Sequence, residues 1–235
     1  MKTIGLIGGM SWESSVVYYQ IINRRTKEIL GGLHSAKSLM YSVDFDAVAR
    51  MQREEDWGGI EKMMIDLARK LEGGGADCVV ICANTIHLVA DAVEQSIRIP
   101  LLHIGDATGA AIKNAGLKKV GLLGTKYTME KDFLKQRLLD KFEIETIVPH
   151  YADREKVHSI IYNELVKGEI SEDSREVYLE IIDKLSANGA EGIVLGCTEI
   201  PLLIGNEYTD AVLFDTTRLH AEKAVEFAVA DVVHQ

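Results

Sequence analysis

One twelve-residue segment occurs twice in the chain, once in each half. GADCVVICANTI at residues 75–86 is echoed by GAEGIVLGCTEI at residues 189–200, and the two copies begin 114 residues apart. Each copy reads Gly-Ala-acid, then a short β-branched run, then a cysteine beside Asn-Thr or Thr-Glu. A run of this kind is typical of a buried strand. The repeat predicts two related halves, each of which delivers a thiol at the end of a strand.

The composition of the chain limits the classes of protein to which it can belong. The 235 residues are 47% apolar and 26% charged, which is enough for one large or two small hydrophobic cores. No apolar run approaches the roughly 18 residues of a membrane span, and the glycine-broken start of the chain is not a signal peptide. Three cysteines without a secretory signal predict reduced thiols and a cytoplasmic location. The formal charge of −10 argues against non-specific nucleic-acid binding.

Short apolar runs alternate along the chain with longer stretches at helical spacing. This alternation predicts βαβ units and a parallel sheet in each half. The strands are expected at residues 4–7, 39–43, 78–82, 100–104, 120–124, 145–148, 193–195 and 212–214. The helices are expected at about residues 11–27, 60–71, 84–95, 129–141, 155–166, 174–187 and 217–233. Doubly wound sheets bind ligands beyond the carboxyl ends of their strands, where both cysteine segments fall.

The cysteines are the candidate chemical groups. A thiol acts as a base or nucleophile in its thiolate form, which a helix N-terminus favours through its dipole and its unpaired N–H groups. Cys197 precedes Thr198-Glu199-Ile200-Pro201, and Pro201 fits the first turn of a helix. Cys197 is therefore placed where activation is expected. Cys82 is placed similarly but one residue earlier in the repeat, and Cys78 is expected in the core. No Cys-x-x-Cys pair or histidine cluster indicates a metal site.

Four motifs carry a resemblance to a known family. They are Gly8-Gly9-Met10-Ser11-Trp12-Glu13-Ser14, Asn84-Thr85-x-His87, Leu123-Gly124-Thr125-x-Tyr127-Thr128-Met129 and Gly196-Cys197-Thr198-Glu199. Together, in this order and over almost the whole chain, they resemble the aspartate/glutamate racemase family. The resemblance implies inversion of the α-carbon of an acidic amino acid, in which one cysteine removes the α-proton and an opposite thiol returns a proton. It also implies that no cofactor is needed.

The resemblance further implies the architecture. We expect two pseudo-symmetric, Rossmann-like or flavodoxin-like αβα domains with parallel sheets and an active site in the cleft between them. The first domain is expected to comprise residues 1–104 with a returning helix at 216–235, and the second residues 105–215. The expected partners are a small amino-acid substrate and, from the resemblance, a second copy of the chain in a homodimer.

A dicarboxylic amino acid needs donors for two carboxylates and acceptors for its ammonium group. Hydroxyls, amides and backbone N–H groups at the strand ends supply the donors. Glu199 is a candidate acceptor for the ammonium group, and the resemblance places side-chain binders after the second strand and at Lys167. The predicted substrate-binding residues are Met10, Ser11, Gln52, Arg53, Asn84, Thr85, Thr125, Tyr127, Lys167, Thr198 and Glu199. His87 is expected to be structural.

One departure from the family pattern bears on the mechanism. The first family cysteine stands immediately before Asn-Thr, where this chain has Ala83, and Cys82 lies one residue earlier. Adjacent residues leave an extended strand in opposite directions, so Cys82 reaches the cleft only if the chain turns there. Cys197 and Cys82 are the predicted catalytic pair. The alternatives are a single-cysteine decarboxylase or isomerase of a small dicarboxylate, and a catalytically silent amino-acid-binding homologue.

Overall fold

The computed structural model describes residues 1–233, which divide into two compact units. Unit 1 is Met1–Ile104 together with the segment from His220 onward, and unit 2 is Gly105–Leu219. The returning segment thus joins unit 1 slightly later than residue 216. The first turn of the last helix belongs with unit 2, because Leu219 packs on its core and the Thr216 hydroxyl donates to the Leu195 carbonyl at 2.8 Å.

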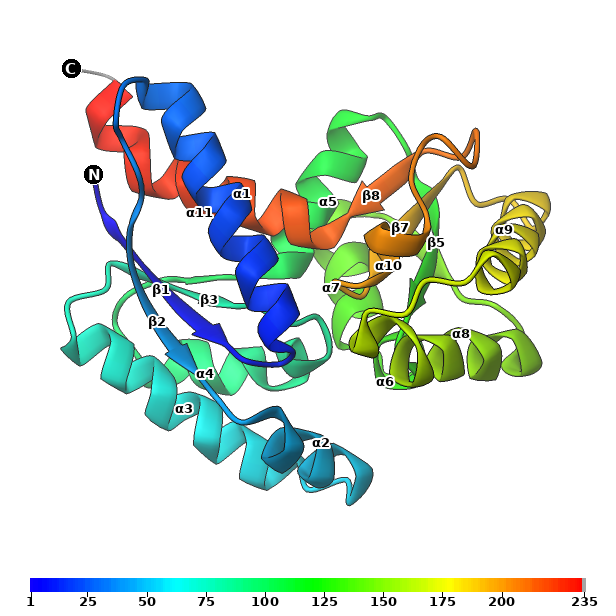
Figure 1. The fold of residues 1–235 in the computed structure, drawn as a ribbon, viewed down its shortest axis with the longest axis horizontal. Helices are drawn as coiled ribbons and strands as arrows, with labels where there is room; N and C mark the ends of the chain where they lie inside the picture. The colour runs from blue at the N-terminus through cyan, green and yellow to red at the C-terminus, as the bar shows by residue number, and fades with distance from the viewer. Residues whose placement is uncertain (234–235) are drawn as a thin grey trace. The chain divides into compact units, whose positions relative to one another are not determined.

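Unit 1 is built on a four-stranded parallel sheet with the order β2-β1-β3-β4 (Figure 1). This order is the flavodoxin-like arrangement, in which the direction of strand addition reverses after β2 and leaves a switch point between β1 and β3. The strands are β1 (Thr3–Gly8), β2 (Lys37–Ser42), β3 (Cys78–Ile81) and β4 (Leu101–Leu102). The helices are α1 (Trp12–Leu30), α2 (Phe45–Arg53), α3 (Trp57–Gly73), the 3-10 turn η1 (Thr85–Val89), α4 (Ala90–Ser96), and α11 (Thr216–Val233), which begins in unit 2.

Two apolar cores cover the two faces of this sheet. On one face, Ile4 and Leu6 pack with Tyr18 of α1 and with Ala221 and Val225 of α11. On the other face, where Figure 1 shows α3 and α4, a second cluster joins the sheet to these helices. The strands of a parallel sheet are buried on both faces, which is why β1 and β3 read as continuous apolar runs rather than alternating ones.

Unit 2 repeats the arrangement with the sheet order β6-β5-β7-β8. The strands are β5 (Lys119–Gly124), β6 (Glu145–Ile147), β7 (Gly192–Gly196) and β8 (Leu213–Asp215). The helices are α5 (Ile104–Asn114), which begins at the last residue of unit 1, α6 (Lys126–Glu130), α7 (Phe133–Phe142), α8 (Tyr151–Asn163), the 3-10 turn η2 (Leu165–Lys167), α9 (Glu172–Ala187) and α10 (Ile200–Leu203). One core joins the sheet to α8 and α9, and the other joins it to α5 and α7.

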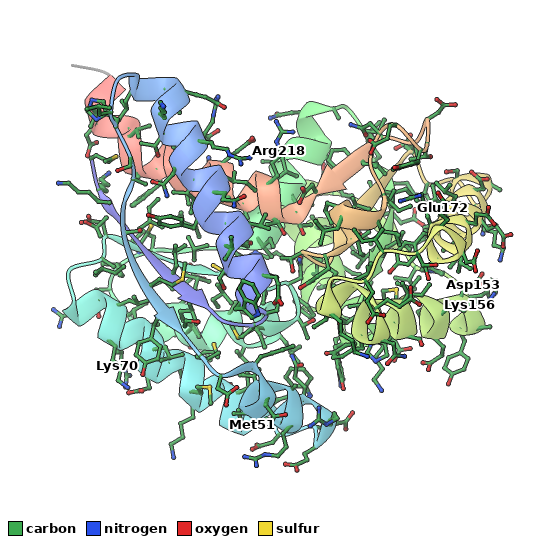
Figure 2. All side chains as sticks on the ribbon, viewed as in Figure 1. Met51, Lys70, Asp153, Lys156, Glu172 and Arg218 are labelled. Atoms are coloured by element: carbon green, nitrogen blue, oxygen red, sulfur yellow. The ribbon has the colours of Figure 1, made fainter. Side chains whose placement is uncertain are left out.

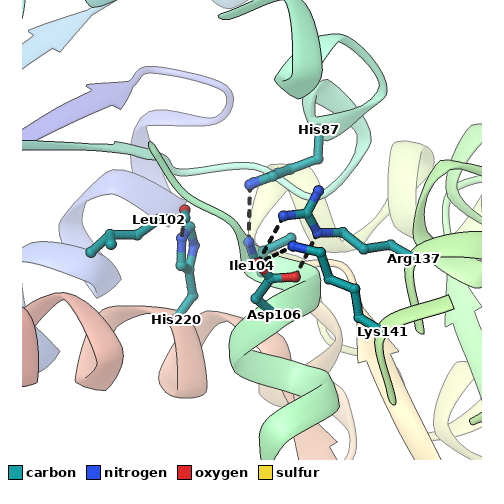
Figure 3. A network of polar contacts seen from close by, with 7 residues as sticks. All are labelled: His87, Leu102, Ile104, Asp106, Arg137, Lys141 and His220. Carbon is teal, nitrogen blue, oxygen red and sulfur yellow. Dashed lines mark hydrogen bonds and ion pairs between the residues drawn. The ribbon is translucent and has the colours of Figure 1, made fainter. Parts of the chain in front are cut away.

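Ion pairs reinforce both helical layers of unit 2. Asp106 of α5 accepts two hydrogen bonds from Arg137 at 2.6 and 2.7 Å and one from Lys141 at 3.0 Å (Figure 3). Burial alone would raise the pKa of Asp106, but these bonds and charges outweigh it and lower the pKa. On the opposite layer, Asp153 of α8, which Figure 2 labels, pairs with Lys184 of α9 at 2.9 Å. Each pair ties neighbouring helices of one layer together.

The first half of the repeated segment forms the same structural device in both units. Gly75 and Gly189 adopt φ values of +91° and +92°, a region that glycine enters without strain. The acidic side chain two residues later then accepts hydrogen bonds from backbone amides at the start of the neighbouring strand. Asp77 accepts from the Thr3 amide at 2.6 Å, and Glu191 accepts from the amides of Lys118 and Lys119 at 2.6 and 2.9 Å. Gly-Ala-acid therefore ends a helix and fixes the entry into β3 or β7.

The predicted α/β class with parallel sheets is confirmed, with local differences. The helix expected at residues 84–95 begins as the 3-10 turn η1, and the helix expected at 129–141 is broken into α6 and α7, because the chain is extended at Lys131. The helices α2 and α5 fall where no helix was expected. Within residues 1–233, no helix combines the length and the apolar character needed to cross a bilayer.

Candidate active site

The end of β1 presents hydroxyl groups at the start of α1. The side chain of Ser11 caps α1 by accepting from the Ser14 amide at 3.3 Å, and the Gly9 amide donates to the Ser15 hydroxyl at 2.7 Å. Met10 and Ser11, both predicted binders, are buried here. A capping hydroxyl satisfies one of the unpaired N–H groups of the helix. This edge of unit 1 therefore gathers polar donors at the carboxyl end of a strand.

The two residues at the end of β3 point into different cores. The Cys82 amide donates to the Ile7 carbonyl at 2.9 Å, so the strand pairing continues through this residue. The Cys82 side chain is fully buried in the cluster with α1 and α11, whereas Ala83 belongs to the cluster on the α3 and α4 face. Burial raises the pKa of the Cys82 thiol. These surroundings are typical of a core cysteine, and a catalytic role for Cys82 stays a prediction.

The turn after β3 carries Asn84 and Thr85, both buried. His87 holds this turn through two contacts. Its backbone amide donates to the Asn84 carbonyl at 3.0 Å, and its Nδ1 lies 2.8 Å from the Ala83 carbonyl oxygen. The Ile104 amide in turn donates to His87 Nε2 at 3.2 Å (Figure 3). The histidine expected to be structural is thus hydrogen-bonded to Ala83, which stands at the family's cysteine position, and to Asn84, which follows it.

The end of β5 in unit 2 mirrors the end of β1. Thr125 caps α6 by accepting from the Thr128 amide at 3.3 Å, and the two hydroxyls lie 3.2 Å apart. In unit 1 the corresponding Ser11 and Ser14 hydroxyls lie 3.3 Å apart. Tyr127 is buried and meets His158 edge to face, and burial lowers the pKa of His158. Both units therefore place a pair of hydroxyls at the first strand of the sheet.

The end of β7 carries a cysteine and a carboxylate in direct contact. The Cys197 thiol donates to Glu199 Oε2 at 2.9 Å, and the Thr198 hydroxyl donates to the same oxygen at 2.6 Å. Cys197 is 9% exposed, Thr198 is 8% exposed and Glu199 is 5% exposed. Glu199 precedes α10 without capping it through its side chain, so the carboxylate is not a helix cap. Its position as a partner of the thiol was not predicted, although the Cys-Thr-Glu spacing is visible in the sequence.

The protonation state of Cys197 differs from the expectation. Burial raises the pKa of the thiol well above its ordinary value, and the charge of Glu199 and the bond to its carboxylate raise it further. The backbone amides of Thr198 and Glu199 act in the opposite direction but do not prevail. The expected lowering at a helix start therefore does not govern this site, where α10 has only four residues. Cys197 rests as a thiol with an acceptor already bound to its proton.

The remaining predicted binders follow the second strand of each unit. Gln52 is buried on α2, which follows β2, whereas Arg53 and the neighbouring Arg50 are exposed on the same helix. Lys167 is exposed at the end of η2, which contacts α10 next to Glu199. Unit 1 thus brings Met10, Ser11, Asn84 and Thr85 to one sheet edge, and unit 2 brings Thr125, Tyr127, Cys197, Thr198 and Glu199 to the equivalent edge. Among the described residues, no three His, Cys, Asp or Glu side chains gather as metal ligands.

Comparison with known proteins gives a consistent result. Residues 7–224 match the family model described as Asp/Glu/Hydantoin racemase. A solved structure from Yersinia pestis, described as a candidate Asp/Glu racemase, is 49% identical with a TM-score of 0.92 and covers 97% of this chain and 100% of that one. An aspartate racemase homologue from Pyrococcus horikoshii is 36% identical, with a TM-score of 0.85 and coverage of 97% and 99%. The broad specificity amino-acid racemase RacX of Bacillus subtilis is 22% identical over 97% of this chain and 98% of its own length.

Proposed function

The chain belongs to the Asp/Glu/hydantoin racemase family, and we propose that it inverts the α-carbon of aspartate or glutamate without a cofactor, with Cys197 as an acid–base group. The observation that carries this proposal is the buried 2.9 Å hydrogen bond from the Cys197 thiol to Glu199. General acid–base catalysis needs a group within hydrogen-bond reach of the proton that it moves. Cys197 and Glu199 form such a pair, and the family match supplies the reaction class.

The raised pKa of Cys197 fits a thiol that ionises only when substrate is bound. Beside the negative charge of Glu199, a thiolate is disfavoured in the free protein. The ammonium group of an amino acid close to Glu199 would oppose this effect, because a nearby positive charge favours the thiolate. Glu199 then takes the thiol proton, and the thiolate takes the α-proton of the substrate. Return of a proton to the opposite face completes the inversion.

The two carboxylates of the substrate require donors, and we assign them to the strand-end groups. Backbone amides and the side chains of Asn84 and Thr85 are proposed for one carboxylate, because a turn of this type presents N–H groups to an anion. The hydroxyls of Ser11 and Thr125 are proposed as further donors, and the hydroxyl of Thr198, which donates its proton to Glu199, is proposed as an acceptor for the ammonium group. Gln52, Arg53 and Lys167 are proposed for the distal carboxylate, and Met10 and Tyr127 for its apolar surroundings. The homodimer and the cytoplasmic location stay predictions.

Ala83 leaves the identity of the second acid open to experiment. With alanine in the family's cysteine position and Cys82 in a core, a water or another side chain would return the proton to the second face. A single-thiol decarboxylase or isomerase and a silent binding protein were the alternatives from the sequence. The family match and the relatives named above favour neither of them.

Exchange of the α-hydrogen tests the proposed function directly. Each enantiomer of aspartate and glutamate is incubated with the protein in deuterium oxide, and deuterium at the α-carbon is followed by NMR. We expect exchange with at least one of these amino acids, and loss of exchange in Cys197→Ala. Cys78→Ala is the matched control, because Cys78 is buried in a core of unit 1. Absence of exchange with all four compounds at high protein concentration would refute the proposal.

A further inference from the structure

We propose that His87 is a positioning residue that orients the backbone N–H groups of Asn84 and Thr85 toward a carboxylate of the substrate. This inference rests on the proposed function and assigns a role to a side chain that the motif alone leaves structural. It starts from the hydrogen bonds that His87 makes on both sides of its ring, all of them inside unit 1.

The bonding partners fix the tautomer of His87. An amide N–H can only donate, so the Ile104 amide at 3.2 Å requires a lone pair on Nε2. The proton of the neutral ring is then on Nδ1, which donates to the Ala83 carbonyl at 2.8 Å. A doubly protonated ring would place two donors face to face at Ile104. The surroundings of His87 therefore select the neutral ring with its proton on Nδ1.

The carbonyls that His87 holds determine where the next amides point. In a planar trans peptide, the C=O and the N–H of the same unit point in opposite directions. The Ala83 carbonyl shares a peptide unit with the Asn84 amide, and the Asn84 carbonyl shares one with the Thr85 amide. Because the ring and the backbone amide of His87 take both carbonyls, the amides of Asn84 and Thr85 point away from His87. Two adjacent backbone donors are thus aimed together, as anion-binding turns require.

The ring of His87 is itself held firmly. It is buried and meets His103 with ring centroids 4.6 Å apart and His220 with centroids 5.5 Å apart. His220 is fixed in turn, because its Nδ1 lies 2.9 Å from the Tyr18 hydroxyl. Its Nε2 lies 2.6 Å from the Leu102 carbonyl oxygen, a contact drawn in Figure 3. A carbonyl acceptor at Nε2 requires a proton there, so His220 Nδ1 accepts from Tyr18. Elements α1, β4 and α11 therefore all contribute to the position of one ring.

A purely structural role makes a different prediction from a positioning role. The first amides of a helix lack intrahelical partners, so His87 also caps α5 at Ile104. If capping α5 were the whole function of His87, loss of the Ile104 bond would weaken the start of that helix. Loss of the Ala83 bond would then lower stability and leave KM unchanged. If His87 positions the turn, the Ala83 bond controls how tightly the substrate carboxylate is held.

Two substitutions separate these bonds. In His87→Asn the amide nitrogen can replace Nδ1 and keep the donor to Ala83, whereas in His87→Gln the amide oxygen can replace Nε2 and keep the acceptor for Ile104. We expect His87→Gln to raise KM about tenfold for both enantiomers, as loss of a modest hydrogen bond implies. His87→Asn is expected to raise KM by less than about threefold. The change in kcat is expected to be smaller than the change in KM, because the carboxylate is bound in the ground state and the transition state alike.

Stability and surface controls complete the design. Both variants leave one bond of His87 unmade, so both are expected to lower the melting temperature, and only KM separates them. His34→Gln and His34→Asn are the matched controls, because His34 is exposed in the loop between α1 and β2. Equal rises in KM for the two His87 variants, or a larger rise for His87→Asn, would overturn the proposal.

A measurement on the unmodified chain tests the proposal even if the His87 variants fail to fold. Nitrogen-15 NMR of the histidine rings reports the tautomer, and we expect His87 to carry its proton on Nδ1 at neutral pH. A proton on Nε2, or a doubly protonated ring, would overturn the proposal whether or not the chain racemises amino acids. Failure of the proposed function appears separately, as absence of α-hydrogen exchange in the unmodified chain.

Discussion

The turn after β3 and the turn after β7 occupy equivalent places in two related sheets but hold different chemistry. After β7, the Cys197 thiol bonds to a carboxylate two residues later. After β3, the equivalent positions are Ala83 and Thr85, which carry no thiol and no acid. The proposed acid–base pair therefore lies in unit 2, although the repeat suggests that the two units are alike.

The two turns also hold their backbones in different ways. In unit 1 the His87 ring and amide take the carbonyls of Ala83 and Asn84. The residue equivalent to His87 in unit 2 is Pro201, which has no N–H, and there the Ile200 amide donates to the Cys197 carbonyl at 3.3 Å. A shared fold thus supports one turn held by hydrogen bonds from His87 and another in which a thiol donates to a carboxylate.

The largest expected effect comes from removing the thiol of unit 2. Cys197→Ala should lower the rate of α-hydrogen exchange by at least about 10³-fold, within the range of general acid–base catalysis. Exchange of deuterium into aspartate or glutamate measures the loss. The same substitution at Cys82 should cost much less, because its side chain lies in the core beside α1 and α11. Equal losses at Cys82 and Cys197 would contradict the unequal roles assigned to the two turns.

Removing the acceptor of the thiol proton should be the next most severe change. Glu199→Gln is expected to lower kcat by about 10²-fold. The charge of Glu199 raises the pKa of Cys197, so its removal should move that pKa downward. The pH dependence of iodoacetamide alkylation of Cys197 measures this shift. A midpoint that stays in place or moves to higher pH would show that Glu199 does not control the thiol.

Restoring the missing thiol should make the two turns more alike. Ala83→Cys places a cysteine directly before Asn84, as in the family pattern, and is expected to raise the exchange rate about tenfold. The gain is smaller than a full acid–base contribution because the new thiol replaces another proton donor. The double variant Ala83→Cys with Cys82→Ala is the matched control and should retain the gain. If the double variant lost the gain in exchange rate, Cys82 rather than the new cysteine at position 83 would be the second thiol.

The smallest expected effects come from the Gly-Ala-acid segment of the repeat, which stabilises the fold in both units. Gly75→Ala and Gly189→Ala should each cost about 1 kcal/mol and lower the melting temperature by about 2–4 °C, because both residues have positive φ. Thermal unfolding measures both. Gly58→Ala, inside α3, should slightly raise stability and serves as the control. A large difference between the first two variants would mean that the two devices are not equivalent.

The fold was largely predictable because the signals that specify it are local. Short apolar runs between glycines predicted the central strands of both sheets, and the Gly-Ala-acid repeat predicted that the halves are related. The 3-10 turn at Thr85–Val89 was not predictable from periodicity, because its apolar residues also fit the start of an ordinary helix. Helix α2 was missed because it has only nine residues, too few for its apolar spacing to identify a helix from the sequence.

The site was predictable in its residue types but not in its electrostatics. The motifs identified Cys197, Thr198 and Glu199, and strand alternation gave the condition under which Cys82 points away from Ala83. The direction of the pKa of Cys197 depends on burial and on the rotamer of Glu199, neither of which the sequence specifies. The role of His87 depends on Ile104, which lies seventeen residues further along the chain.

The last helix imposes an order on the biosynthesis of the protein. Ala221, Val225 and Val229 of α11 complete the core that covers Ile4 and Leu6. A ribosome must therefore finish unit 2 before this face of the first sheet is covered, which takes several seconds at about 5–20 residues per second. Throughout that interval the nascent first unit exposes the part of this apolar face that α1 does not cover. A fragment that ends at Ile104 would keep that part permanently exposed and would be prone to aggregate rather than behave as a separable domain.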